Sequence, residues 1–318
     1  MFGLKPETLQ YWYQNHLSDY LPDISCGKWP PQKIETVDKS TGEIKEKPVY
    51  VLKKENIGEK MSIDDKAIGG DGFTIFSNHQ TGKIALMVEC TNAEEVQSAM
   101  KPFGDELEKV KDITMDMSAT YALASENLMP QAARVIDKFH VMKYVYEAVS
   151  EVRKDIRKSL ARNLSKGKKK TEEDKRILSE IELVRRVRHS VTQSPEKWSE
   201  SMETIINQVF EKHDDLKLAY QISQNFKEWY AYYNRKKSRE QICSDLHQWY
   251  EQAKRLKAFE SVVKMIRKHE DEIVNFFKHG MTSAGAERLN GKIQRFVTNN
   301  YGIKNKDFIL YRMAGYFS

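Results

Sequence analysis

The chain has 318 residues, a formal net charge of +6 and hydrophobic residues at 40% of its positions. That length suffices for one large domain or two ordinary ones with a packed core. The mild positive charge is by itself a weak indication of nucleic-acid binding. The three cysteines, Cys26, Cys90 and Cys243, lie far apart and form no CxxC pair, so the sequence supports neither a zinc ribbon nor a disulfide framework.

The same features predict a cytoplasmic protein. Few and unpaired cysteines fit a reducing compartment. The N-terminal residues lack the basic start and apolar run of a signal peptide. No window approaches the ~18 apolar residues that a membrane-spanning helix needs.

Positive charge is concentrated between Arg153 and Arg188, where 14 lysines and arginines stand against 6 acidic residues. This segment therefore carries 14 − 6 = +8, and the remainder of a chain with a total of +6 carries −2. A segment of this kind is either a solvated helical face or a surface that meets nucleic acid. Charge alone leaves both interpretations open.

The first 60 residues give the weakest pattern. Residues 9–21 predict one amphipathic helix. Residues 22–60 are rich in lysine, proline, glycine and glutamate and predict loop or an extended arm, and Pro30 and Pro31 argue against helix there. Residues 1–60 are therefore interpreted as an N-terminal arm or helix whose role the sequence does not define.

Residues 61–103 predict a three-stranded antiparallel meander followed by a helix. A hairpin turn is expected at His79–Gly82, and Asn92 is expected to cap a helix that extends to Phe103. The three strands are expected at MSIDD (61–65), GFTIFSN (72–78) and KIALMVE (83–89).

Residues 111–140 predict a strand, an acid, a helix, a second strand, a second acid and a histidine. The run Ile113–Met115 ends in Asp116, and the run Ala132–Ile136 ends in Asp137, with His140 just beyond. Short apolar runs like these are typical of buried parallel strands whose carboxyl ends open onto a site. The element order becomes β-β-β-α-β-α-β, which is the ribonuclease-H-like arrangement of an α/β fold.

Residues 141–279 carry helical periodicity and no strand signal, which predicts an all-α insertion. A further helix is expected from about residue 286 to Val297, with Glu287 in its first turn, and residues 299–318 read as a short closing segment. The full prediction is a ribonuclease-H-like mixed sheet, β-β-β-α-β-α-β-α, formed by residues 61–140 and 280–318. The helical insertion then lies between the fifth strand and the helix that carries Glu287.

Three carboxylates occupy comparable places in this arrangement. Asp64 ends the first strand, Asp116 ends the fourth, and Glu287 opens the last helix. The first and fourth strands would be neighbours, so the acids would converge. Carboxylate oxygens suit hard divalent cations, and two such ions can clamp the attacking and leaving oxygens of a phosphodiester. We therefore expect these three residues to be catalytic and to hold two ions of Mg²⁺ or Mn²⁺.

Each of these residues also has a plainer interpretation. A lone aspartate at a strand end more often caps or faces solvent, so only the joint placement carries the argument. Asp65 is an alternative ligand, but neighbouring strand residues face opposite ways. His140 either contacts the scissile phosphate and transfers a proton, or packs at a helix start. The residues expected to contact DNA are Lys143, Arg153, Arg157, Asn290, Lys292 and Arg295.

Several stretches of the chain resemble a known family. They are SIDD at 62–65, VKDITMDMSATY at 110–121, PQAARVIDKFHVMKYVYEAVSEVR at 130–153 and TSAGAERLNGKIQRFVTNNYGIKNKDF at 282–308. Together they are similar to bacterial DDE transposases of the ISL3 type, over about residues 60–318. The resemblance implies a catalytic triad at Asp64, Asp116 and Glu287. It also implies that the Asp137–His140 run precedes a helical insertion.

The resemblance further implies an enzyme of the bacterial nucleoid that hydrolyses a phosphodiester at transposon ends and joins the freed 3′-hydroxyl to target DNA. Its partner would be double-stranded DNA, and two ends would require a homodimer or a larger assembly. The chain has Asp64-Asp65 where the family has Asp-Glu, and Arg288 where it has glycine. The family's N-terminal helix-turn-helix segment has no counterpart in this sequence, so a separately encoded subunit for end recognition is one expectation.

Two rival functions fit the same residues. One is a ribonuclease-H-like, structure-specific nuclease that hydrolyses DNA without strand transfer. The other is an inactive or domesticated derivative that only binds DNA, against which the three acids argue.

Overall fold

The computed structural model describes residues 5–37, 43–90, 92–165, 171–279, 284–300 and 305–318. The chain forms two compact units, which are described separately. The first unit comprises residues 1–137 and 279–318 and is called the sheet unit. The second comprises residues 138–278 and is called the helical unit.

The sheet unit is built on one mixed sheet with the strand order β1-β2-β5-β4-β3-β6-β7. The central strand β3 pairs antiparallel with β4 and parallel with β6, and β6 continues parallel to β7. Both β6 and the end of β7 are buried, as expected for parallel strands. The strands are β1 (Gln32–Val37), β2 (Ile44–Leu52), β3 (Lys60–Ile68), β4 (Asp71–Asn78), β5 (Ile84–Val88), β6 (Asp112–Met115) and β7 (Ala133–Ile136).

The first two strands correct the expectation of loop or an extended arm over residues 22–60. β1 and β2 form an antiparallel pair, and β2 joins the sheet edge at β5. The apolar signal is short because only Val49–Val51 of β2 are fully buried, while its first three residues are exposed. Pairing of β2 with β5, and of β1 with β2, therefore places these strands in the sheet.

The segment at residues 9–21 also differs from the expected single helix. It forms α1 (Pro6–Trp12), a π-helical turn at Tyr13–Leu17 and α2 (Tyr20–Ser25). The backbone of Ser18 is extended, with φ −112° and ψ 159°, and this separates the helices.

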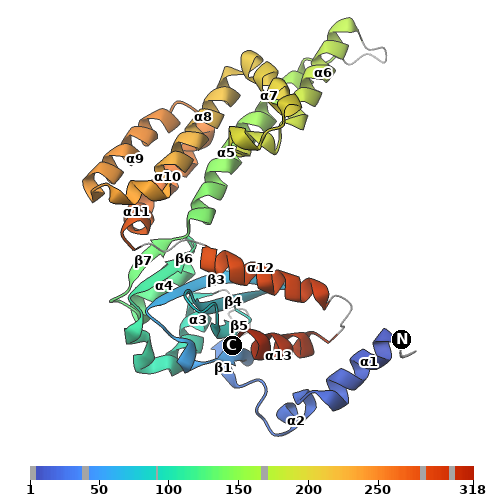
Figure 1. Cartoon of the computed structure of the whole chain (residues 1–318), viewed down its shortest axis with the longest axis vertical. Helices are drawn as coiled ribbons and strands as arrows, with labels where there is room; N and C mark the ends of the chain where they lie inside the picture. The colour runs from blue at the N-terminus through green and yellow to red at the C-terminus, as the bar shows by residue number, and fades with distance from the viewer. Residues whose placement is uncertain (1–4, 38–42, 91, 166–170, 280–283, 301–304) are drawn as a thin grey trace. The chain divides into compact units, whose positions relative to one another are not determined.

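Helices cover both faces of the sheet. The helices α3 (Ala93–Met100) and α4 (Ala119–Leu128) connect the strands from β5 to β7, and the Asn92 side chain caps α3 as predicted. On the opposite face lie α12 (Ala284–Asn299) and α13 (Lys306–Phe317) (Figure 1). The last of these corrects the expected closing segment, because Asn305 accepts a hydrogen bond from the Phe308 amide and starts a full helix.

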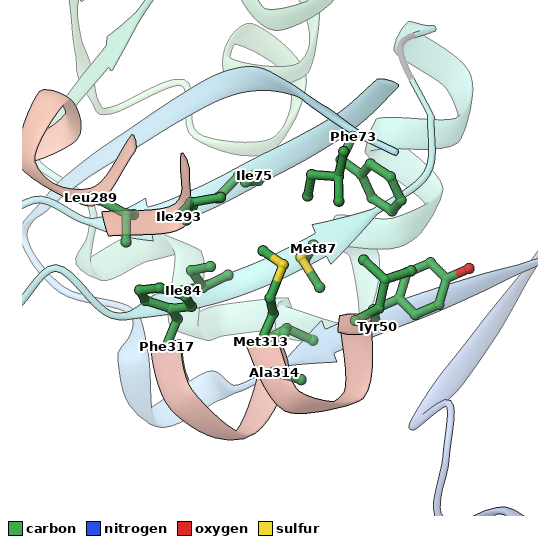
Figure 2. Packing of buried hydrophobic residues seen from close by; sticks show 13 residues of the cluster. Tyr50, Phe73, Ile75, Ile84, Met87, Leu289, Ile293, Met313, Ala314 and Phe317 are labelled. Atoms are coloured by element: carbon green, nitrogen blue, oxygen red, sulfur yellow. The ribbon is translucent and has the colours of Figure 1, made fainter. Parts of the chain in front are cut away.

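The core beneath α12 and α13 fixes their position on the sheet. Leu289 and Ile293 from α12 pack with Met313 and Phe317 from α13 against the strands (Figure 2). The strand residues of this cluster are Tyr50, Val51, Ile68, Phe73, Ile75, Ile84 and Met87. This packing places one face of α12 over β3, β4 and β5.

All regular elements in the described residues of the helical unit are helices. Its core is aromatic, with Trp229 and Trp249 packed around the Phe226 ring at centroid distances of 5.3 and 4.5 Å. Residues 260–279 form two helices, because the backbone leaves helical geometry at His269. The helices are α5 (Lys138–Arg162), α6 (Glu172–Arg186), α7 (Glu200–Lys212), α8 (Asp214–Trp229), α9 (Arg239–Ala253), α10 (Glu260–Lys268) and α11 (Glu270–His279). Every helix in the described ranges is too short or too polar to cross a membrane.

Candidate active site

Asp64 and Asp116 lie level with each other on neighbouring strands. The parallel register of β3 and β6 pairs Lys60 with Asp112 and Ser62 with Thr114. Continuing that register by two residues brings Asp64 beside Asp116. Level residues of parallel strands point to the same face, so the two carboxylates project together. Both side chains are partly exposed.

The face to which they project is the one that α12 covers. Asp64 pairs across the sheet with Ile75, and Ile75 belongs to the core beneath α12. The amide nitrogen Nδ2 of Asn290 donates a hydrogen bond to Oδ2 of Asp64 at 2.8 Å. One side chain of α12 is therefore in direct contact with the carboxylate pair.

Backbone amides orient both carboxylates. The amide of Asp65 donates to Oδ1 of Asp64 at 2.9 Å, and the amide of Ser118 donates to Oδ1 of Asp116 at 2.8 Å. A carboxylate offers about four lone-pair sites, so each retains acceptor capacity beyond these bonds. The arrangement is a fixed pair of oxygen donors of the kind that Mg²⁺ and Mn²⁺ bind.

Buried hydroxyls lie next to this pair on the same face. The hydroxyl oxygens of Ser62 and Thr114 are buried and make no hydrogen bond within the described part of the chain. They precede Asp64 and Asp116 by two residues and are level with each other. The region around the carboxylates thus holds polar groups that the packing against α12 does not satisfy.

Asp65, the alternative ligand, lies on the other face of the sheet. The Tyr121 hydroxyl of α4 donates to Oδ1 of Asp65 and lies 3.1 Å from the Thr74 hydroxyl. The Thr74 hydroxyl donates in turn to the Cys90 carbonyl at 2.7 Å. Burial raises the pKa of Tyr121, and the hydrogen bond to Asp65 raises it further. Asp65 therefore holds a tyrosine in its neutral form and does not face Asp116.

Glu287 lies in α12, one helical turn before Asn290. Its side chain lies outside the described residues. The start of α12 is closely packed, because a Cβ added to Gly285 would approach the His79 carbonyl oxygen to 2.8 Å. Only glycine fits this position, which brings the first turn of α12 against the β4–β5 hairpin.

A second contact holds the chain just before α12. The Nδ1 atom of His279 lies 2.6 Å from Oδ1 of Asp112, and Nζ of Lys60 donates to the His279 carbonyl at 3.1 Å. Lys60 also lies 3.6 Å from Asp112. These residues were not among those predicted from the sequence. The available signal was a charged residue at the start of a strand, Lys60 in β3 and Asp112 in β6.

The chain was compared with protein families, curated proteins and solved structures. A family model described as Transposase, of the DDE ISL3 type, matches residues 61–313. The chain belongs to the ISL3-type DDE transposase family. No curated protein and no solved structure matched the chain in the corresponding comparisons. The match spans the strands from β3 to β7, the helical unit and α12, so all three expected acids of this transposase lie within it.

The remaining predicted residues of the transposase fall into two groups. His140 and Lys143 lie in the first turns of α5 in the helical unit, and the Lys143 side chain is exposed. Lys292 and Arg295 are exposed on α12 in the sheet unit. The described side chains, among which Glu287 is not included, contain no group of three His, Cys, Asp or Glu that could hold a metal.

Arg153, one of the residues predicted to contact DNA, is buried between α5 and α6. Its side chain is 3% exposed, and its Nη1 atom donates to the Val184 carbonyl of α6 at 3.3 Å. Burial lowers its pKa, and the neighbouring Arg157 and Arg188 charges lower it further. The guanidinium therefore joins α5 to α6 and is not presented to DNA, whereas Arg157 on the next turn is partly exposed.

Proposed function

We propose that the transposase performs metal-dependent hydrolysis of a phosphodiester at transposon ends and then transfers the freed 3′-hydroxyl to target DNA. The observation that carries this proposal is the level placement of Asp64 and Asp116, with Asn290 of the Glu287-bearing helix bonded to one of them. The membership in a DDE transposase family supports the same assignment.

The divalent ions would be held by Asp64, Asp116 and Glu287. When bound, two Mg²⁺ or Mn²⁺ ions supply Lewis acidity that favours ionisation of the attacking hydroxyl and stabilises the leaving oxygen. The two described carboxylates fit this role because they are partly exposed, share one face and offer only oxygen donors. The unsatisfied hydroxyls of Ser62 and Thr114 beside them are a further sign of a polar site.

Other residues of the chain would orient the carboxylates and the DNA. Asn290 fixes the rotamer of Asp64 through the Nδ2–Oδ2 hydrogen bond, so it is a positioning residue in addition to its expected DNA contact. Lys292 and Arg295 are exposed on the same helix and would neutralise phosphates of the bound strand. His140 stays a predicted contact of the scissile phosphate, and Lys143 and Arg157 stay predicted phosphate contacts of α5.

The fold proposed for the catalytic part is ribonuclease-H-like. The strand order β5-β4-β3-β6-β7, with three antiparallel strands followed by two parallel ones, supports it. The helical unit then corresponds to the insertion between the fifth strand of that fold and α12. In this interpretation β1 and β2 are additions at the β5 edge.

Double-stranded DNA is the proposed partner, both as transposon end and as target. Cutting two ends requires two active sites, so we propose a homodimer or a larger assembly on DNA.

A strand-cleavage assay with labelled transposon ends tests the proposal. Replacement of Asp116→Asn or Glu287→Gln should abolish cleavage, because each removes an anionic metal ligand. If either variant cuts as well as the parent chain, the site assignment is wrong.

The same assay separates the rival functions when a target plasmid is added. A joined product identifies a transposase, whereas cleavage with no joined product identifies a nuclease. DNA binding with no cleavage in Mg²⁺ or Mn²⁺ identifies an inactive derivative.

A further inference from the structure

A pocket of about 570 Å³ lies in the sheet unit, outside the carboxylate site. Its walls come from the N-terminal segment, from β2 and from α12 and α13. This volume is in the range of small-molecule sites in proteins. Its lining is dominated by aromatic rings, which are Tyr13, Trp29, Tyr50, Phe296, Tyr311 and Tyr316.

Tyr50 places a polar group in the wall of this pocket. The residue is 5% exposed, and its ring packs against Phe73 and Trp29 at centroid distances of 5.8 Å each. Its hydroxyl has no hydrogen-bond partner among the described residues and points away from Met313 and Ala314 (Figure 2). Burial raises the pKa of Tyr50 to about 12, so the hydroxyl remains a donor at neutral pH. The hydroxyl lies at the wall of the pocket and can donate a hydrogen bond to a ligand bound there.

The rings of the pocket offer faces on which a flat ligand can stack. Tyr316 is 71% exposed and lies 5.8 Å from the Phe296 ring at an interplanar angle of 36°. Trp29 meets Tyr311 edge-on at 5.2 Å, which fixes the opposite wall. An exposed aromatic beside fixed rings is the arrangement that stacks a nucleobase in proteins that bind single strands.

Positive charge surrounds this aromatic pocket. Lys28, Lys53 and Arg312 line it, and the Arg312 guanidinium lies 5.1 Å from the centroid of the Tyr13 ring. The one acid in the lining, Asp23, accepts a hydrogen bond from the Tyr311 hydroxyl at 2.8 Å. Aromatic faces with cations at the rim match a base attached to a phosphate, and they do not match an apolar peptide or a lipid chain.

We infer that this pocket binds one unstacked nucleotide of the DNA strand. The base stacks on the Tyr316 ring, and an acceptor atom at the edge of the base accepts a hydrogen bond from the Tyr50 hydroxyl. The phosphate lies toward Lys28 and Lys53. The family supplies the source of the ligand, because a transposase handles DNA strands. Free nucleotides share the same chemistry and are the competing source.

The position of the pocket along α12 fits this source. Phe296 of the pocket wall follows Asn290 by six residues, which is about 9 Å along the helix axis. At roughly 3.4 Å per nucleotide, that distance spans two or three nucleotides. The exposed Lys292 and Arg295 lie between the two positions in sequence and can contact the intervening phosphates.

Binding of a short single-stranded oligonucleotide that carries one 2-aminopurine tests the inference. The full chain is titrated in buffer with EDTA, so the result does not depend on cleavage or on the carboxylate site. The fluorescence of the 2-aminopurine base should be quenched when the oligonucleotide binds. Tyr316→Ala should weaken binding about 5- to 100-fold, since stacking on one aromatic is worth ~1–3 kcal/mol. Tyr50→Phe, which keeps the buried ring, should weaken binding about 2- to 10-fold.

A matched control is Tyr11→Ala, which removes another aromatic of the N-terminal segment that is 59% exposed and does not line the pocket. This variant should bind as the parent chain does. A second arm adds a deoxymononucleotide as competitor, which should displace the strand only at far higher concentration.

Two results would overturn the inference. In one, Tyr316→Ala and Tyr50→Phe bind the strand as well as Tyr11→Ala does. In the other, the mononucleotide binds as tightly as the strand, which would assign the pocket to free nucleotides. Neither result touches the proposed cleavage function, which depends on Asp64, Asp116 and Glu287.

Discussion

Asp64 and Asp65 are neighbours on β3, yet the two faces of the sheet give them different surroundings. Asp64 faces α12, lies level with Asp116 and accepts a hydrogen bond from Asn290. Asp65 faces α4 and accepts from the buried hydroxyl of Tyr121. The period of two along a strand decides this difference. The same residue type one position apart therefore lies beside a second carboxylate on one face and beside a buried tyrosine on the other.

The largest expected effect is on cleavage when Asp64 and Asp65 are changed in the same way. Asp64→Asn should lower the cleavage rate about 100-fold or more, because metal-ion stabilisation of a phosphoryl transition state is worth several kcal/mol. Asp65→Asn is the matched control and keeps an oxygen that can accept from Tyr121. It should cut within about threefold of the parent chain at a temperature where both are folded. Equal losses of cleavage rate in the two variants would contradict the claim that the two faces of the sheet have different roles.

The next effect concerns the contact between α12 and the carboxylate pair. Asn290→Ala removes the donor to Asp64 and should lower metal affinity or cleavage about 10- to 100-fold, as losses of ligand-orienting partners do. Gln294→Ala, one turn later on α12 and exposed, is the control and should have little effect. The response of cleavage to Mg²⁺ concentration measures the difference. Restoration of the parent curve by saturating Mg²⁺ would show that Asn290 acts on metal affinity.

A stability effect is expected on the opposite face. Tyr121→Phe leaves the Asp65 and Thr74 side chains without their shared partner, and should lower the free energy of unfolding by ~1–3 kcal/mol. Cleavage per folded molecule should not change. Urea unfolding measures the loss, with Tyr144→Phe, an exposed tyrosine of α5, as the control. A cleavage defect at full folding would mean that the two faces are coupled.

The smallest effect is a difference in stability at alkaline pH. Burial raises the pKa of Tyr121 above its ordinary value of about 10. Its contribution to stability is therefore complete below pH 10. It is lost as pH rises from there toward the folded-state pKa, because only the unfolded chain releases the proton. Between pH 10 and 11 the parent chain should lose up to ~1.4 kcal/mol more than Tyr121→Phe does. Equal losses of stability in the two proteins would contradict the claim that the Tyr121 hydroxyl is buried and stays protonated in the folded chain.

The sequence was sufficient for those parts of the sheet that local pattern determines. The strands that carry Asp64 and precede Asp116 were predictable from their apolar runs, but Asp64 does not end its strand as expected, because β3 continues to Ile68. That these two strands are neighbours was predicted from the order of the elements, but the residue-by-residue register, which pairs Lys60 with Asp112, could not be read from the sequence pattern. It depends on how the chain between the strands folds.

Other features depended on contacts between distant segments. The strand β2 shows little alternation and joins the sheet by pairing with β5, and β1 pairs in turn with β2. Arg153 follows the apolar residues of α5 closely enough to be carried into the interface with α6, where a carbonyl accepts from it. The Tyr121–Asp65 hydrogen bond joins residues 56 positions apart. In the last two cases a charged or polar residue that is expected at the surface from the sequence is buried or hydrogen-bonded in the fold.

The central claim is that the face bearing Asp64, and not the face bearing Asp65, binds divalent cations. Calorimetric titration of Mn²⁺ into the full chain and into the Asp64→Asn and Asp65→Asn variants tests it most directly, because it requires neither DNA nor cleavage. We predict that the parent chain and Asp65→Asn bind Mn²⁺ with similar heat, and that Asp64→Asn loses this binding. Retention of binding by Asp64→Asn together with its loss in Asp65→Asn would contradict the claim.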